Sequence, residues 1–275
     1  MITINILLEN YAINKKFETK PGLSIMIKHN ENNILLDVGP DDKFIKNAIT
    51  QDIDLKNINC LFLSHNHNDH TGGVNEFLKI NDTADIYIMD NIHNKYYVKL
   101  LFFNIFIGTK LDYKYKTKIK QIENDLELPG KIHFLKNTVA KYIKPTFNKS
   151  LYKKYNGKIV NDDFTHEGIL VLEDNNELVI FNSCSHNGIL NIIETVKEKL
   201  PNKRIRSYVG GLHLHNPKTN ENEKNDYLDY LIKELREMEI KLYIGHCTGK
   251  HSLHYLKKYL GDTINEINTG MEYNV

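Results

Sequence analysis

Three histidines and an aspartate fall within six residues of one another, directly after the short apolar stretch 59–63. These polar residues are His65, His67, Asp69 and His70. In an extended segment, side chains two residues apart point to the same side, so His65 and His67 can bind one ion together. Asp69 and His70 are adjacent, and the chain must turn there because Thr71-Gly72-Gly73 supplies a helix start. We therefore expect their side chains to face a second ion beside the first.

The donor atoms of this run indicate which metals it would bind. Imidazole and carboxylate groups without a thiolate suit Zn, Fe, Mn or Ni, and a pair of such ions about 3.5–4 Å apart is a common hydrolytic device. The alternative is a surface loop that is merely rich in histidine. Such a loop would not be expected to follow a buried strand and to precede a glycine pair that opens a helix. The run therefore predicts a centre of two divalent ions, with Zn as the first candidate.

Two later histidines follow apolar strands in the same way. The stretch 178–181 leads into a turn of small residues that contains His186, and the stretch 240–244 leads into a turn that contains His246. The ends of strands in α/β sheets are where such proteins build their sites. Each histidine alone is equally compatible with a hydrogen-bonded turn residue. Together with the first run, their context favours metal ligation.

The periodicity of the chain predicts one mixed α/β domain over residues 1–275. Apolar runs that read as strands alternate with stretches of helical spacing after residue 71 and around 189–200, 228–238 and 250–260. The expected strands are 2–8, 23–28, 33–37, 59–63, 86–89, 168–173, 177–182, 206–210 and 240–244, with one or two more in 264–275. The stretch from about 91 to 158 lacks this rhythm. We expect it to be a partly helical insertion that lies over one face of the domain.

Charge is distributed unevenly although the net charge is only +1. Residues 91–158 contain 15 lysines against 4 acidic residues, so the remaining chain carries 21 basic against 31 acidic residues. A basic surface of this kind would attract an anionic substrate, whereas a lysine-rich solvated face without function is an equal alternative. The apolar run 100–108 within this segment is expected to serve as a lid or as a contact in a homodimer.

Composition also bears on the compartment. The three cysteines, Cys60, Cys184 and Cys247, are too few for a disulfide framework and favour a reducing cytoplasm. The first eight residues lack a basic region and alternate like a strand, so no signal peptide is expected. The longest apolar stretch is far too short to span a bilayer. We expect a cytoplasmic protein without a membrane partner.

The pattern His65-x-His67-x-Asp69-His70 resembles the signature of the metallo-β-lactamase superfamily. The resemblance implies an αβ/βα four-layer sandwich in which two mixed sheets are flanked by helices and present ligands at strand ends. It also implies that Asp37 supports the ligands from behind. On this basis we expect one ion on His65, His67 and His186, and the other on Asp69, His70 and His246.

Several segments further resemble one subgroup, the dihydropterin-ribofuranosylaminobenzene-phosphate synthase family of methanopterin biosynthesis. The matching segments are 6–10, 22–25, 163–167, 183–189, 210–214 and 245–249. The chain departs from the superfamily pattern in lacking the aspartate that bridges two ions, because the comparable strand ends in Cys184-Ser185-His186. Cys184 is either a thiolate ligand or a small buried thiol, and the second interpretation is favoured. The chain departs from the subgroup at Pro21, where a histidine is usual.

Other histidines and cysteines have weaker assignments. His213 follows a strand and Gly210-Gly211, where backbone comes close to a ligand, so we expect it to bind substrate or to support the centre. His166, His251 and His254 are interpreted as surface residues. Cys247 should point away from the metal if its neighbour His246 points toward it.

Three classes of function fit these features. The first is a metal-dependent hydrolase of an anionic, phosphorylated small molecule, in which Asp69 is a ligand and also orients the attacking water. The second is the pterin-linked synthase, a transferase. The third, ranked last because no separate recognition module is visible, is a nuclease in which aromatic residues stack bases. Those aromatic residues are Tyr96, Tyr97, Tyr113, Tyr115, Tyr152 and Tyr155.

Overall fold

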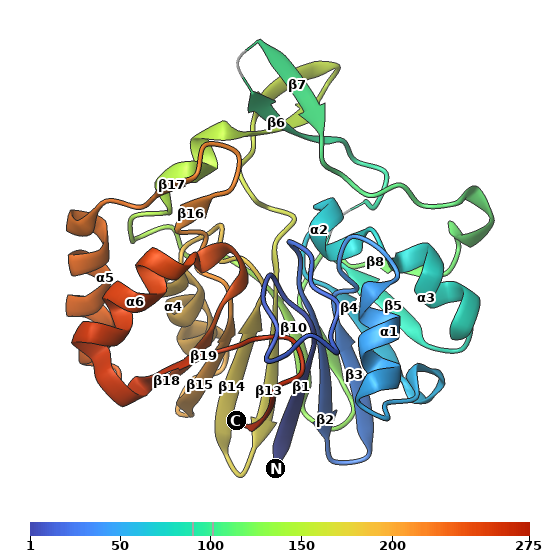
Figure 1. The fold of residues 1–275 in the computed structure, drawn as a ribbon, viewed down its shortest axis with the longest axis horizontal. Coiled ribbons are helices and arrows are strands. Elements are labelled where there is room, and N and C mark those ends of the chain that lie inside the picture. The colour runs from blue at the N-terminus through green and yellow to red at the C-terminus, as the bar shows by residue number, and fades with distance from the viewer. Residues whose placement is uncertain (90, 101) are drawn as a thin grey trace.

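The apolar runs of the chain build two seven-stranded sheets that face each other, seen in the computed structural model of Figure 1. The structure describes residues 1–89, 91–100 and 102–275. The first sheet has the order β20-β1-β2-β3-β4-β5-β8, in which β3, β4, β5 and β8 are parallel. Its strands are β1 (Ile2–Leu8), β2 (Ser24–His29), β3 (Asn32–Leu36), β4 (Cys60–Leu63), β5 (Asp85–Ile88), β8 (Ile119–Gln121) and β20 (Glu272–Asn274).

The second sheet has the order β19-β18-β15-β14-β13-β10-β9. It is also mixed, because β14, β15, β18 and β19 run parallel while β9, β10 and β13 pair antiparallel. Its strands are β9 (Leu126–Leu128), β10 (Ile132–Lys136), β13 (Gly168–Asp174), β14 (Glu177–Asn182), β15 (Arg204–Gly210), β18 (Lys241–Ile244) and β19 (Ile264–Glu266).

Helices cover the outer face of each sheet (Figure 1). On the first sheet lie α1 (Lys43–Thr50) and α3 (Val74–Ile80), and on the second lie α4 (Ile189–Lys199), α5 (Asn225–Arg236) and α6 (Lys250–Leu260). Phe44 and Phe77 pack beneath the first pair, and a separate apolar cluster packs beneath the other three helices. A third cluster, which includes Phe62 and Phe134, fills the space between the sheets. This arrangement confirms the predicted four-layer sandwich. No helix within the described ranges is long and apolar enough to cross a membrane.

Residues 91–158 differ from the prediction, because the described part of this segment contains strands and only short 3₁₀ turns. Strand β8 is the last strand of the first large sheet, and β10 and β9 are the last two strands of the second. A separate four-stranded sheet has the order β12-β11-β6-β7. Its strands are β6 (Tyr96–Leu100), β7 (Phe103–Phe106), β11 (Leu151–Tyr155) and β12 (Lys158–Asn161), and the 3₁₀ turns are η2 (Tyr113–Tyr115) and η3 (Thr146–Ser150). The aromatic and β-branched residues in these runs favour strands, so the partly helical expectation is wrong.

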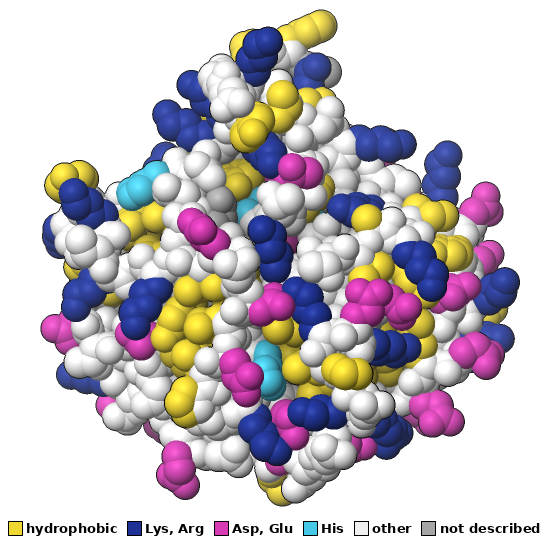
Figure 2. Space-filling model, turned by 180° about the vertical axis from the view of Figure 1, so that it is seen from behind, with side chains coloured by type: hydrophobic (Ala, Val, Ile, Leu, Met, Phe, Trp, Pro, Cys, Tyr) yellow, Lys and Arg dark blue, Asp and Glu magenta, His cyan; other side chains and the backbone are white. Residues whose placement is uncertain are grey.

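This four-stranded sheet forms a protrusion over the end of the sandwich at which α2 (Asn68–Thr71) lies (Figure 1). Lys, Arg and hydrophobic side chains gather on the protrusion at the top of Figure 2. Phe102 is 93% exposed and Phe103 is 73% exposed. The protrusion therefore presents apolar surface to solvent beside positive charge.

Replacing Phe134 by Ala should destabilise the protein by about 3–5 kcal/mol, the range for a large buried aromatic side chain. Phe134 is 1% exposed and its ring lies 5.0 Å from that of Phe62, between the two sheets. Phe103→Ala is the matched control, since truncation of an exposed side chain changes stability by about 0.5 kcal/mol or less. Urea unfolding of both variants measures the difference. Equal urea midpoints for the two variants would contradict the placement of Phe134 in the core between the two sheets.

Candidate metal centre

The functional side chains come from the carboxyl ends of parallel strands in both sheets. In the first sheet, Asp37 follows β3, and His65 and His67 follow β4. In the second sheet, His186 follows β14 and His246 follows β18. These strand ends meet at one edge of the sandwich, which is where α/β proteins place their sites.

Asp69 and His70 are presented by the single turn of α2. The glycine pair that follows allows this turn to pack closely on the loop after β3. A Cβ atom on Gly72 would lie 2.4 Å from the carbonyl oxygen of Pro40, and one on Gly73 would lie 2.4 Å from that of Val38. Larger residues would push the turn away, so the two glycines fix the position of Asp69 and His70.

The first predicted ligand set is brought together. One ligand atom of each of His65, His67 and His186 lies within 4.8 Å of those of the other two. The Nε2 atoms of all three are buried and have no hydrogen-bond partner among the described residues. Buried polar atoms are almost always paired, because an unpaired one costs about 1–3 kcal/mol. Three such atoms that converge on one point therefore fit a bound cation.

The protonation of these imidazoles suits metal binding. Burial lowers the pKa of His67 to about 3, and neighbouring histidines such as His166 add to the effect. Burial likewise lowers the pKa of His65 and of His186 well below the usual range. All three rings are therefore neutral at pH 7, and only a neutral imidazole can ligate a metal.

The second predicted set is also assembled. The Nε2 atoms of His70 and His246 lie 3.2 Å apart, and Asp69 Oδ2 lies 3.6 Å from each of them. Burial alone would raise the pKa of Asp69, but His70 and His246 lower it below the usual range. The Asp69 side chain is 42% exposed, so an ionised carboxylate lies at the open side of the set.

Hydrogen bonds to the Nδ1 atoms turn the Nε2 atoms toward the centre. Nδ1 of His70 lies 2.7 Å from Asp37 Oδ2, and Nδ1 of His65 lies 2.8 Å from Ser64 Oγ. The amide oxygens of Asn148 and Asn10 lie 3.1 Å from Nδ1 of His186 and of His246 respectively. Each amide group is fixed because its nitrogen donates to the backbone carbonyl of the same histidine. Such partners fix the tautomer that leaves Nε2 free to ligate.

Asp37 lies behind the predicted ligands and contacts His70 and Ser64. It is fully buried, and its carboxylate also accepts hydrogen bonds from the backbone N–H and hydroxyl of Ser64, each at 2.7 Å, and from Ser183 Oγ at 2.6 Å. One carboxylate thus joins the loops after β3, β4 and β14.

Sequence reasoning gave no role to two buried glutamates that hold ligand loops. Glu167 accepts hydrogen bonds from the backbone N–H groups of His186 and Asn187, at 2.7 and 2.8 Å. Glu9 accepts the backbone N–H of His246. The signal available for Glu9 was its place directly after the buried strand β1, because a carboxylate there must find a buried donor.

His166 is not a surface residue, in contrast to the prediction. It is 2% exposed, its Nε2 lies 2.9 Å from Asp162 Oδ2, and its Nδ1 accepts the backbone N–H of Asn66 at 3.2 Å. Both ring nitrogens are therefore engaged with the protein. His166 supports the loop that carries His65 and His67 rather than offering a free ligand atom. His251 and His254 are exposed, as predicted.

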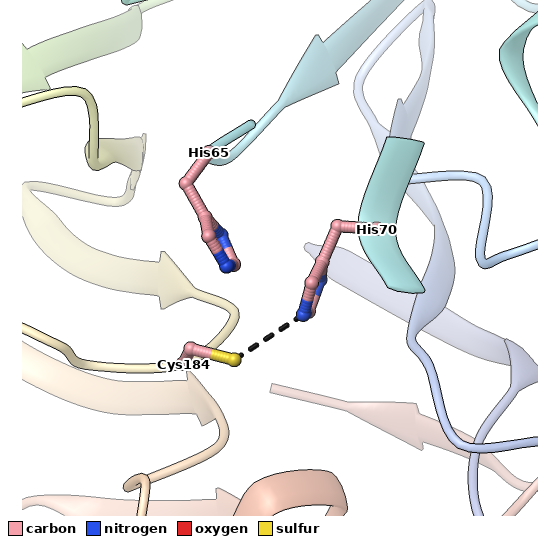
Figure 3. Close-up of side chains that lie close together, drawn as sticks. All are labelled: His65, His70 and Cys184. Atoms are coloured by element: carbon pink, nitrogen blue, oxygen red, sulfur yellow. Dashed lines mark hydrogen bonds between the residues drawn. The ribbon is translucent and has the colours of Figure 1, made fainter. Parts of the chain in front are cut away.

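Cys184 and Cys247 both lie at the centre. Cys184 Sγ lies 3.2 Å from His70 Nε2 and points toward His65 and His70 (Figure 3). Cys247 Sγ lies 3.4 Å from Cys184 Sγ, so the prediction that Cys247 points away from the site is wrong. His246 has a left-handed φ of 52° and opens the 3₁₀ turn η4 (His246–Thr248), so neighbouring side chains do not alternate as they do in a strand. Burial raises the pKa of the Cys184 thiol well above its usual range.

His213 lies beside this group, with its ring 4.2 Å from that of His186. Both of its ring nitrogens are buried without a hydrogen-bond partner among the described residues. It also lines the cavity described next. Its position is therefore compatible with either role predicted for it, contact with substrate or support of the centre.

A cavity of about 680 Å³ opens onto both ligand sets. Its walls include Asp69, Cys184 and His246. The residues of segment 91–158 that line the cavity are Val98, Ile107, Phe147, Ser150 and Leu151 rather than its lysines. The lysines that line the cavity are Lys218 and Lys250. The positive charge at the cavity therefore comes from Lys218, which lies in the stretch after β15, and from Lys250, the first residue of α6.

Comparison with known proteins supports the resemblance. A family description, the metallo-beta-lactamase superfamily, matches residues 18–145. The 7,8-dihydropterin-6-methyl-4-(beta-D-ribofuranosyl)-aminobenzene-5'-phosphate synthase of Methanocaldococcus jannaschii is 29% identical over 283 residues, 90% of this chain and 88% of that protein. An uncharacterized protein of the same organism is 26% identical over 255 residues, 91% of this chain and 92% of that protein.

A crystal structure described as a metal-dependent hydrolase of the beta-lactamase superfamily superposes with a TM-score of 0.83. It shares 25% sequence identity, and the match covers 100% of this chain and 99% of that one. The predicted resemblance to this superfamily is therefore confirmed.

Proposed function

We propose that this chain, which has the metallo-β-lactamase fold, is a metal-dependent hydrolase of small anionic molecules. The observation that carries the proposal is the convergence of the three unpaired Nε2 atoms of His65, His67 and His186. Of these residues, His67 and His186 line the cavity together with the ionised Asp69. Nitrogen and oxygen donors of this kind suit Zn first, with Fe, Mn or Ni as alternatives.

His65, His67 and His186 would hold one divalent ion, and Asp69, His70 and His246 would hold the other. When bound, such a pair lowers the pKa of water to about 7 and attracts anionic oxygens. Asp69 is suited to orient the attacking water, because its carboxylate is ionised and half exposed toward the cavity. The buried Asp37 and Ser64 keep His70 and His65 oriented throughout.

The substrate charge is inferred from the mouth of the cavity. Lys218 and Lys250 line it, and Lys250 Nζ lies 3.8 Å from the centre of the Tyr11 ring. Positive side chains at the rim of a concave site raise the local concentration of anions. The apolar wall formed by Val98, Ile107, Phe147 and Leu151 would contact an uncharged part of the same molecule.

Replacing Lys250 by Gln should raise KM for an anionic substrate several-fold and leave kcat almost unchanged. Lys250 lies at the mouth, so its charge attracts the substrate equally before and during the reaction. Lys114→Gln is the control, because Lys114 is not among the residues that line the cavity. Steady-state kinetics at low and physiological salt measure both effects, since exposed charges are screened over about 8 Å at physiological ionic strength. An unchanged KM in the Lys250 variant would contradict an anionic substrate.

A second candidate function is synthesis of the pterin compound, and one observation favours it. The similarity to the Methanocaldococcus jannaschii synthase extends over 90% of this chain and 88% of that protein. The aromatic and apolar cavity walls would also accept a flat ring.

Metal analysis combined with a turnover panel distinguishes the candidates. The purified full chain is loaded with Zn and assayed on a phosphodiester, a lactone, a thioester, and a dihydropterin with a leaving group on its 6-methyl carbon paired with an arylamine phosphate. We expect two ions per chain and hydrolysis of an anionic ester that stops when a chelator removes the metal. Condensation of the pterin pair without hydrolysis would establish the synthase instead. Protein that binds no metal would refute both proposals.

A further inference from the structure

We propose that Cys184 supplies a thiolate ligand that joins the two metal sites. Its Sγ atom belongs to a group with His65 and His70 whose ligand atoms all lie within 4.8 Å of one another. His65 is part of the first ligand set, and His70 is part of the second. Figure 3 shows His65 and Cys184, which follow strands, and His70, which lies on α2, with their side chains directed toward one another. The sulfur therefore lies between the two sets rather than inside one of them.

The observed distances fit ligands of a shared ion. Metal–sulfur bonds of about 2.3 Å and metal–nitrogen bonds of about 2.0–2.1 Å place ligand atoms of one tetrahedral ion roughly 3.5 Å apart. Cys184 Sγ lies 3.2 Å from His70 Nε2, close to that separation. Neither atom would have to move far to bind the same ion.

The charge of the centre also calls for an additional anionic donor. Two divalent ions bring four positive charges into a largely buried site, and uncompensated buried charge is costly. Five of the six residues in the two sets are histidines, which bring no negative charge, so Asp69 is the single anionic donor of the two sets. A metal-bound thiol is deprotonated and adds a second negative charge. Cys184, just after β14, can thus supply as a thiolate the negative charge that a carboxylate would otherwise supply.

The backbone on both sides of Cys184 holds the sulfur in this direction. Ser183 Oγ donates to Asp37 at 2.6 Å, and the backbone N–H of Ser185 donates to Asn182 Oδ1 at 2.7 Å. Ser185 Oγ also donates to the carbonyl of Gly211, and its φ is left-handed at 55°. A residue fixed in this way between two anchored serines is preorganised to ligate.

Cys247 provides the internal comparison. Its sulfur lies 3.4 Å from that of Cys184, and it belongs to a different group, with Cys184 and His213. The group that contains both His65 and His70 includes Cys184 and not Cys247. If the two thiols instead held an ion of their own with His213, both cysteines would be required equally.

Cobalt substitution of the full chain tests this inference, which rests on the proposed two-metal centre. Co²⁺ bound to a thiolate gives a near-ultraviolet charge-transfer absorption that nitrogen and oxygen ligands do not give. We expect this band in the unmodified protein and in Cys247→Ser, and its loss in Cys184→Ser. We also expect Cys184→Ser to bind its second ion at least about tenfold more weakly. Cys184→Asp should restore binding of two ions without the band, because a carboxylate can replace the thiolate.

The outcomes separate this inference from the proposed function. Two bound Co²⁺ ions without the band would overturn the role of Cys184 and leave the metal centre intact. Equal loss of the band in Cys184→Ser and Cys247→Ser would overturn it in favour of the cysteine pair with His213. Absence of any Co²⁺ binding in the unmodified protein would refute the metal centre itself. Because Cys184→Asp is expected to bind both ions, poor folding of the serine variant alone does not decide the test.

Discussion

Replacing Asp69 by Ala should lower turnover by roughly 10²–10³-fold or more, the range for loss of one group that acts electrostatically in the transition state. The same substitution should remove the second ion, because Asp69 is the carboxylate of that set. Stability without metal should change by no more than about 1 kcal/mol, since the side chain is 42% exposed. Turnover, metal content and urea unfolding of one preparation measure all three effects.

Two further variants make the Asp69 result specific. Asp69→Asn keeps the size of the side chain and removes its charge, so we expect it to lose nearly as much activity as the alanine variant. Asp262→Ala removes a carboxylate from an exposed residue and should change neither activity nor metal content. Retention of full activity in Asp69→Ala would exclude Asp69 from the mechanism, whatever its position in the structure.

The parts of the site that could be predicted from the sequence are those defined by local periodicity. His65 and His67 are two residues apart after a strand, and His186 and His246 each follow a strand end, so the chain itself places them at one edge of a sheet. The contact of Glu9 with a ligand loop depends on segments far apart in the chain, and that of Glu167 reaches across two strands, β13 and β14. Glu9 accepts a hydrogen bond from His246, 237 residues away, and no local pattern encodes such a partner.

Two errors of the prediction have similar physical causes. The orientation of Cys247 depends on the left-handed φ of His246, which tertiary contacts impose and which no glycine or asparagine at that position announces. The strands within residues 91–158 are short and partly exposed, so they lack the strict alternation of a half-buried sheet. Helix α1 was not predicted, since it is only eight residues long and buries few apolar side chains.

Replacing Asp37 by Ala should destabilise the metal-free protein by about 3–5 kcal/mol, the cost of removing one partner from a buried charged network. The substitution would leave the donors of Ser64, Ser183 and His70 without their acceptor. Asp37 also has a left-handed φ of 57°, which costs alanine roughly a further 1–2 kcal/mol. Metal affinity should fall by about 10–100-fold, because the ring of His70 would no longer be oriented.

Asp37→Asn and Ser183→Ala separate the contributions to this network. Asparagine tolerates the left-handed φ but replaces one acceptor by a donor. The stability of the Asp37→Asn variant should therefore lie between those of the unmodified protein and of Asp37→Ala. Ser183→Ala removes a single hydrogen bond and should cost only about 1 kcal/mol. Urea unfolding without metal ranks the variants by stability, and metal titration then ranks them by metal affinity.

If Asp37→Ala unfolds at the urea concentration of the unmodified protein, Asp37 does not join the three loops, and the rigid support proposed for His70 is wrong. Asp69→Ala should lose activity with its stability intact, whereas Asp37→Ala should lose both, because Asp69 faces the cavity and Asp37 is buried behind the ligands.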